Sequence, residues 1–244
     1  MTDFSNRGLY RRAVSGAGYV ISRGHSDIHV IAPAGVREAA QAALDAVYAE
    51  IGDYLAAHPA FAGLVPIGDD LLAPRAVRRM IAASARAGVG PMAAVAGAVN
   101  EAVGLAIADR AEDFYLENGG DVFLRTAAPC VAAVYAGSSP LSMKTGIRLP
   151  PGSWGVCTSS GTVGPSLSFG RADAAVAVSP DPVLADACAT RLGNMISKAG
   201  DIAPALEAIC AISGVTGALG ICGGAIGALG DIEVVPLKGA GDPS

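Results

Sequence analysis

The chain has 244 residues, 52% of them hydrophobic, which is enough to bury a sizeable core, and we expect residues 1–244 to form a single domain. The formal net charge is −5 and the basic residues are scattered, so there is no dense Lys/Arg tract of the kind that binds nucleic acid. The first residues contain no apolar signal segment and the five cysteines form no CxxC pair, so we expect a cytoplasmic protein with free thiols.

The first part of the chain predicts short strands followed by helices. Strand-like runs separated by Gly, Ser and His predict an antiparallel meander over residues 9–14, 18–23 and 27–32. After Pro33, apolar residues recur every three or four positions up to Pro59, which predicts a long helix. Two further helices are predicted over residues 74–88 and 91–110. The arginines of the first of these are expected to face outward: Arg75, Arg78, Arg79 and Arg86.

The second part predicts several strands and two helices. The strands are expected at residues 114–117, 122–125, 131–135, 144–148, 154–157 and 174–178, and the helices at 182–198 and 203–212. Residues 208–230 lack charged side chains and are long enough to cross a membrane, but seven glycines disfavour a membrane helix. We interpret this segment as two buried strands joined at Gly223-Gly224, and pairing of these strands across a homodimer is a further hypothesis. No membrane partner is expected.

Strands and helices occur in groups along the chain and do not alternate one for one. This order favours an α+β fold with largely antiparallel sheets over a doubly wound parallel sheet.

Several common catalytic motifs are absent from the sequence. It contains no GxGxxG after a strand and no GxxxxGK[ST], HExxH or GxSxG pattern, and its histidines are His25, His29 and His58. These absences argue against classical nucleotide-binding, zinc-protease and serine-hydrolase sites. Nothing in the sequence places a histidine near a serine or cysteine nucleophile.

A glycine-rich segment, Asn118-Gly119-Gly120-Asp121, lies between two predicted strands. Asn-Gly is a preferred type I′ hairpin turn because both central positions need a positive φ. The paired glycines would also let backbone N–H groups approach a bound phosphate or ring, with Asn118 and Asp121 as polar partners. The segment therefore fits a simple turn or a ligand-binding loop.

Two later segments also carry polar groups suited to a ligand. Thr158-Ser159-Ser160-Gly161 follows a predicted strand, and its hydroxyls suit polar ligand groups, although a solvated loop has the same composition. Asp186 and Thr190 are four residues apart and so share one helix face. A carboxylate and a hydroxyl suit Mg²⁺, while a carboxylate near a helix start is also favoured by the helix dipole.

Taken in this order, the three segments resemble the signature of the ApbE family of FAD:protein FMN transferases, and more closely an uncharacterised branch of it. The first resembles the family's glycine-rich flavin loop and the second its Thr-Ser-Gly segment. Residues 185–190, Ala-Asp-Ala-Cys-Ala-Thr, resemble its Ala-Asp-Ala-x-Ala-Thr helix. Residues 90–97 occupy the place of a further family loop, and the resemblance covers about residues 88–200.

The resemblance implies a duplicated T-fold-like α+β domain whose pocket binds FAD. It implies that Mg²⁺ is held by Asp186 and Thr190 against the pyrophosphate, where it stabilises charge as FMN passes to a hydroxyl of a protein acceptor. The residues that match the two loops, 118–121 and 158–161, would then line the flavin pocket.

Two departures from the family pattern leave the reaction open. The family's loop lysine is missing from residues 93–99, and no histidine follows Thr158, so no general base is assigned. Three hypotheses follow, each for a protein with a small nucleotide-like ligand. The first is a Mg²⁺-dependent, FAD-using transferase. The second is a cytoplasmic enzyme or assembly factor of cofactor or sulfur metabolism that reuses the pocket without FMN transfer. The third hypothesis is a non-catalytic ligand-binding protein.

Overall fold

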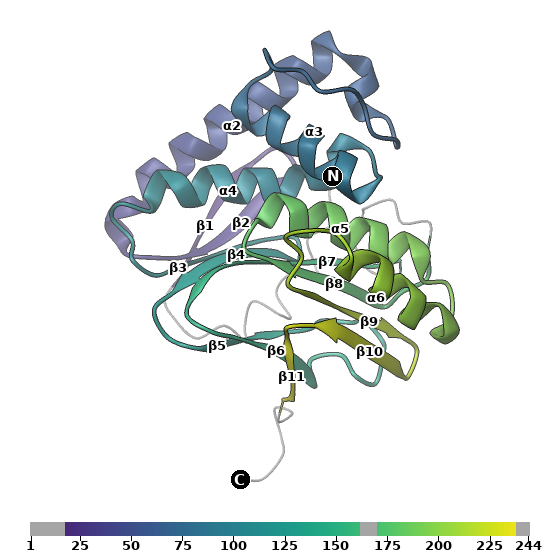
Figure 1. The fold of residues 1–244 in the computed structure, drawn as a ribbon. Coiled ribbons are helices and arrows are strands. Elements are labelled where there is room, and N and C mark those ends of the chain that lie inside the picture. The colour runs from purple at the N-terminus through teal and green to yellow at the C-terminus, as the bar shows by residue number, and fades with distance from the viewer. Residues whose placement is uncertain (1–17, 162–169, 238–244) are drawn as a thin grey trace.

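The computed structural model describes residues 18–161 and 170–237, and within them the chain forms three layers. An eight-stranded sheet lies in the middle, the helices cover one of its faces, and a three-stranded sheet lies against the other (Figure 1). The strand predicted at residues 9–14 lies outside the described residues.

Both sheets are antiparallel throughout their described pairings. The large sheet has the order β1 (Tyr19–Arg23), β2 (Ser26–Ile31), β3 (Phe114–Asn118), β4 (Asp121–Thr126), β7 (Gly152–Ser159), β8 (Ala174–Ser179), β9 (Gly217–Cys222), β10 (Ala225–Gly230). The small sheet has the order β11 (Glu233–Pro236), β6 (Thr145–Leu149), β5 (Cys130–Ala133). The predicted α+β class with antiparallel sheets is confirmed.

The helix layer contains five α-helices and four short 3₁₀ turns within the described residues. The helices are α2 (Arg37–Ala57), α3 (Arg75–Ala87), α4 (Val95–Ile107), α5 (Pro182–Met195) and α6 (Ile202–Cys210). The 3₁₀ turns are η1 (Ala34–Val36), η2 (Pro59–Ala62), η3 (Pro91–Ala94) and η4 (Ala199–Asp201). Gly88 ends α3 in the left-handed conformation, with φ 70°, as its position in the sequence predicts.

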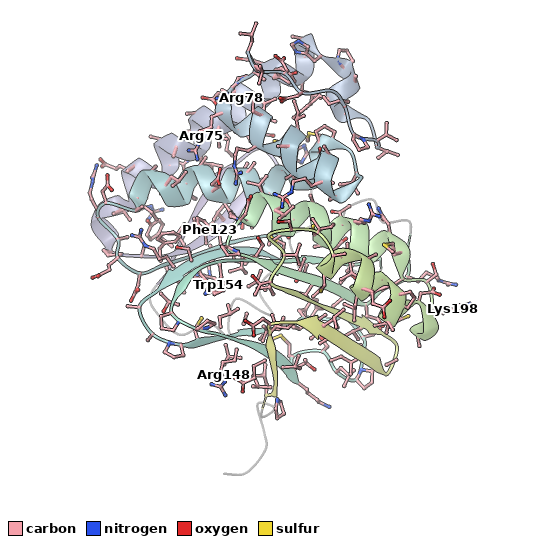
Figure 2. The ribbon with its side chains drawn as sticks, in the orientation of Figure 1. Arg75, Arg78, Phe123, Arg148, Trp154 and Lys198 are labelled. Atoms are coloured by element: carbon pink, nitrogen blue, oxygen red, sulfur yellow. The ribbon has the colours of Figure 1, made fainter. Side chains whose placement is uncertain are left out.

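Side chains on the two faces of the large sheet enter two separate hydrophobic clusters, because successive residues of a strand point to opposite faces. Leu116 and Phe123 pack under the helices, whereas Leu124 and Val156 pack toward the small sheet. Phe123 and the neighbouring Trp154 mark these two sides in Figure 2. Each predicted site residue on these strands therefore points either toward the helices or toward the small sheet.

Some element boundaries differ from the sequence predictions. The helix predicted from Pro91 begins as the 3₁₀ turn η3, and α4 ends at Ile107. Residues 208–210 are the end of α6, so the first of the two apolar strands starts only at Gly217. The predicted Gly223-Gly224 turn is confirmed, since Cys222 pairs with Ala225. Of the two strands predicted to be buried, β9 is buried, whereas β10 is largely exposed because it is the edge strand of the sheet. The short strand β11 was not predicted, because its four residues end in a proline.

Strand β10 is the last strand at one edge of the large sheet. Pairing of this region with a second copy stays a prediction. Within the described residues no single helix is long and apolar enough to span a membrane; α3 together with η3 and α4 reaches that length only as a pair bent by 104°.

Candidate functional site

The turn between β3 and β4 is built from two glycines. Asn118 pairs with Asp121, so the two central residues are Gly119 and Gly120, with φ 70° and 106°. The predicted Asn118-Gly119 turn is thus shifted by one residue, and two glycines adopt the positive φ of the central positions at less cost than Asn-Gly would. The Gly120 N–H donates to Glu117 Oε1 at 2.9 Å, which fixes the turn.

Asp121 joins the first predicted segment to the second. Strands β4 and β7 are neighbours, and the Thr158 N–H donates to Asp121 Oδ1 at 3.2 Å. The Cys157 thiol also hydrogen-bonds to the Asp121 side chain, from the helix-facing side of β7. The two polar segments are therefore in direct contact, although they are 37 positions apart in the sequence.

The rest of the second segment lies close to α5 and to the start of β8. Ser159 Oγ lies 3.0 Å from where a Cβ on Gly193 of α5 would be. The Ser160 hydroxyl and the Gly161 N–H both donate to the Ala172 carbonyl, at 3.4 and 2.9 Å. The segment is thus fixed at its far end, and its role in ligand binding stays a prediction.

The start of α5 is held tightly against both α4 and β7. Asp181 caps the helix by accepting hydrogen bonds from the Val183 and Leu184 N–H groups, at 3.0 and 3.1 Å. A Cβ on Gly97 would lie 2.3 Å from the Pro182 carbonyl oxygen, and one on Gly155 would lie 2.5 Å from Pro182 Cα. These two glycines allow the close approach that brings the first turns of α5 over the sheet.

Asp186 and Thr190 both face the segment before and at the start of α4. Asp186 is 7% exposed, and its Oδ2 accepts a hydrogen bond from the Gly97 N–H at 2.8 Å. The Thr190 hydroxyl is 3.5 Å from the Ala93 carbonyl oxygen. The predicted shared helix face is therefore present, and it meets residues 93–97, which lie within the run 90–97 that is expected to correspond to the further family loop.

Asp121 and Asp186 are close enough to influence each other's ionisation. Burial raises the pKa of Asp186 to about 7, although the N–H groups of Gly97 and Ala96 oppose the shift. Burial, and then the negative charge of Asp186, raise the pKa of Asp121 well above its usual value. Among residues 18–161 and 170–237, no ion pair joins either carboxylate to a basic side chain.

Cys157 lies beside this pair but is a poor nucleophile. Burial, followed by the charges of Asp121 and Asp186, raises the pKa of its thiol well above the ordinary value. Its sulfur is 3.6 Å from the Pro182 carbonyl oxygen. A raised thiol pKa disfavours the reactive thiolate, so we assign Cys157 to the core.

Asn100 also belongs to this site, although the sequence analysis did not single it out. It is 1% exposed on α4, and its Nδ2 donates to the Asp121 carbonyl oxygen at 2.9 Å. An amide among the small and apolar residues of the predicted helix was the available signal, since buried amides need a specific partner.

A second acidic cluster lies between the same helices. Arg79 of α3 donates to Glu101 of α4 at 2.8 Å and to Asp181, the N-cap residue of α5, at 2.7 Å. The prediction that Arg79 faces outward is wrong, because these two carboxylates draw its guanidinium between the helices. Arg75 and Arg78 are exposed, as predicted.

The donor set around Asp121 and Asp186 suits a hard cation. The described residues contain no group of three His, Cys, Asp or Glu side chains able to hold a metal ion by themselves. The carboxylates, the Thr190 hydroxyl and the Asn100 carbonyl are nevertheless oxygen donors, the ligand type that Mg²⁺ prefers, and ligand oxygens and waters would have to complete its shell. A cavity of about 280 Å³ elsewhere, lined by residues such as Tyr115 and Cys130, involves none of the predicted site residues.

Comparisons with known proteins agree with this fold. A family model described as AbpE bacteria matches residues 11–226. A UPF0280 protein of Methanocella arvoryzae is 46% identical over 171 residues, which cover 67% of this chain and 69% of that protein. A UPF0280 protein of Methanosphaerula palustris is 44% identical over 164 residues, covering 65% and 68%.

Two solved structures share the architecture. The flavinyl transferase ApbE of Pseudomonas stutzeri, in its apo form, aligns with a TM-score of 0.56 at 13% identity, over 93% of this chain and 98% of that one. The flavin transferase ApbE of Vibrio cholerae aligns with a TM-score of 0.60 at 11% identity, over 90% and 96%. At such low identities this likeness establishes the fold.

Proposed function

The chain belongs to the family described as AbpE bacteria, and on that premise we propose that it binds FAD with a divalent cation and acts as a flavin transferase. The observation that carries the proposal is the meeting of three separate segments at one carboxylate pair, in which Asp186 is buried and Asp121 is half-buried. Asp121 follows the glycine turn, Thr158 donates to it, and Asp186 faces it from α5. Solved proteins with this fold are flavin transferases.

In this proposal Asp186 and Asp121 hold the cation, with Thr190 on the next turn of α5. A bound Mg²⁺ would neutralise negative charge on a pyrophosphate. Gly119 and Gly120 leave the backbone open to close approach by a ring or phosphate, and the hydroxyls of residues 158–160 offer hydrogen bonds to it.

Transfer of FMN from FAD would break the pyrophosphate bond, release AMP and form a phosphoester with an acceptor hydroxyl, whose proton must be received. The described site residues include no lysine or histidine. Because Asp121 and Asp186 are assigned to the cation in this proposal, the proton would pass to solvent water.

The same observation favours a second candidate function. Without the lysine and histidine of the transferases, the pocket would bind a nucleotide-like ligand for a different reaction, or retain it without turnover. This candidate shares the cation and the pocket with the first and differs in the fate of FAD.

Calorimetric titration of FAD into the protein, with and without Mg²⁺, tests the proposal. We expect binding that weakens at least about tenfold without Mg²⁺ or in Asp186→Ala, because the anionic pyrophosphate then meets uncompensated carboxylates or lacks its cation. Asp109→Ala removes an exposed carboxylate outside the site and should bind as the wild type does. No FAD binding with Mg²⁺ present would contradict the proposal.

A second assay separates the two candidates. The protein is incubated with FAD, Mg²⁺ and hydroxyl-bearing acceptor peptides, and AMP release and covalent FMN are followed by chromatography and mass spectrometry. Release of AMP together with FMN-modified peptide supports transfer, whereas intact FAD after prolonged incubation supports the second candidate.

A further inference from the structure

Asn100 has one satisfied and one unsatisfied end. Its Nδ2 donates to the backbone carbonyl of Asp121 at 2.9 Å, while its Oδ1 has no hydrogen-bond partner within the described residues. The side chain is 1% exposed. A buried carbonyl oxygen without a partner is costly, so an oxygen left in this state in a polar site points to a ligand that is absent from the protein chain.

The orientation of the amide follows from its partner. The Asp121 backbone carbonyl is only an acceptor, so the end of the Asn100 amide that faces it must be the NH₂ group. Exchange of the two ends would place two carbonyl oxygens against each other. Oδ1 is therefore the end that is left for another group, and that group must be a hydrogen-bond donor or a cation.

Asn100 lies next to the residues that carry the carboxylate pair. Asn100 lies three residues, about one turn, after Gly97, whose N–H binds Asp186. Its other end is anchored on the backbone of Asp121 itself. Ionised carboxylates have no proton to donate, so neither Asp121 nor Asp186 satisfies Oδ1 in its charged form.

We propose that Oδ1 of Asn100 is a direct ligand of the divalent cation held by Asp121 and Asp186. The inference rests on the proposed function only in requiring that cation, and not in requiring FAD or flavin transfer. One cation satisfies the two carboxylates and the amide carbonyl together. The Asn100 carbonyl would be the third oxygen ligand of this cation. The described residues contain no group of three carboxylate, histidine or cysteine side chains that could hold a metal ion.

Binding of Mn²⁺ to the nucleotide-free protein tests this inference, with free Mn²⁺ followed by electron paramagnetic resonance and Mg²⁺ used as competitor. Asn100→Leu keeps the shape of the side chain and removes the carbonyl. We expect it to weaken Mn²⁺ binding at least about tenfold. Asn100→Asp keeps an oxygen and adds a negative charge, so we expect it to bind Mn²⁺ as tightly as the wild type or more tightly.

Ser84→Ala is a matched control, because Ser84 is also buried on a helix but its hydroxyl donates to Ile81. It should leave Mn²⁺ affinity unchanged. Wild-type affinity in folded Asn100→Leu, or no Mn²⁺ binding by the wild type, would overturn the inference. If Asn100→Leu does not fold, weakened binding by Asn100→Asp would overturn it as well.

The outcome is separable from that of the proposed function. Mn²⁺ binding that depends on Asn100 in a protein that does not bind FAD would support the inference and reject the flavin proposal. FAD binding that depends on Mg²⁺ but is unchanged in Asn100→Leu would support the flavin proposal and reject the role of Asn100 as a cation ligand.

Discussion

Two acidic clusters lie beside helices α4 and α5, and only one of them has a basic partner among the described residues. Between α3, α4 and α5, Arg79 is hydrogen-bonded to Glu101 and Asp181. Although burial opposes it, the hydrogen bonds and charges of these two carboxylates raise the pKa of Arg79. Asp121 and Asp186 have no such basic partner in the described part of the chain, and their own pKa values are raised.

The difference separates a structural cluster from a ligand site. A carboxylate whose charge is already paired within the chain needs no further cation, and removal of its basic partner is destabilising. A buried carboxylate pair without a cation is unstable when ionised, and it gains most from a metal ion or a proton. Substitutions in the two clusters should therefore differ in their effects on the stability of the protein and on its stabilisation by Mg²⁺.

The largest effect is expected for Asp186→Asn, which removes one charge of the unpaired cluster. Stabilisation of the wild type by Mg²⁺ should reach about 2.7 kcal/mol at a hundredfold excess over Kd, and the variant should lose it. Without Mg²⁺ the variant should be as stable as the wild type or more so, because the repulsion with Asp121 is removed. Thermal unfolding with and without Mg²⁺ measures the stabilisation by Mg²⁺ and the stability of the metal-free protein. A metal-free variant much less stable than the wild type would argue against repulsion between Asp121 and Asp186.

A pH dependence of comparable size is expected from the same residue. The pKa of Asp186 is about 7 in the folded protein and about 3.9 in an unfolded chain, so the folded state holds the extra proton between these values. The contribution of this group to stability without Mg²⁺ should therefore be fully present below about pH 4, be lost as the pH rises to about 7, and not change further above that pH.

Urea unfolding at pH 5 and pH 8 measures this slope. Mg²⁺ should stabilise the protein more at pH 8, because its carboxylate ligands must be deprotonated. Asp186→Asn should flatten the slope of the apo protein, and an unchanged slope would assign the pH dependence to other groups.

A smaller effect is expected for Arg79→Gln, in the paired cluster. The guanidinium side chain is 33% exposed, so solvent screening reduces the loss of stability to about 1–2 kcal/mol. The loss should be the same with and without Mg²⁺, as measured by urea unfolding. A loss that appears only in the presence of Mg²⁺ would show that the two clusters are not independent.

The smallest effect is expected for Thr190→Val. The hydroxyl is 3.5 Å from the Ala93 carbonyl oxygen, so this contact contributes little to stability. We expect a change of at most about 0.5 kcal/mol in unfolding free energy, with Mg²⁺ affinity reduced only a few-fold. A loss of Mg²⁺ affinity as large as that of Asp186→Asn would make Thr190 a principal ligand.

Local patterns in the sequence predicted most of the elements, whereas contacts between distant elements decided the site. The apolar spacing that ends near Pro59 and the glycines that end α3 and join β9 to β10 are local signals, and the structure follows them. The contact of Thr158 with Asp121 depends on β7 lying next to β4, which only the strand order determines. Likewise, Arg79 looked solvent-facing because its partner Asp181 comes 102 residues later.

Asn100 is a second case in which the local sequence did not determine a contact between distant elements. Its position in an apolar helix was visible in the sequence, but its unsatisfied oxygen depends on which way the amide faces. That orientation is set by the backbone of Asp121, on a strand that comes after the helix.

The most direct test of the cation site is anomalous diffraction from crystals of the protein grown with Mn²⁺. A single strong peak within bonding distance of Asp121, Asp186 and the Asn100 carbonyl is the predicted result. No peak at these carboxylates, with Mn²⁺ bound elsewhere or not at all, would contradict the assignment of the unpaired cluster as a metal site.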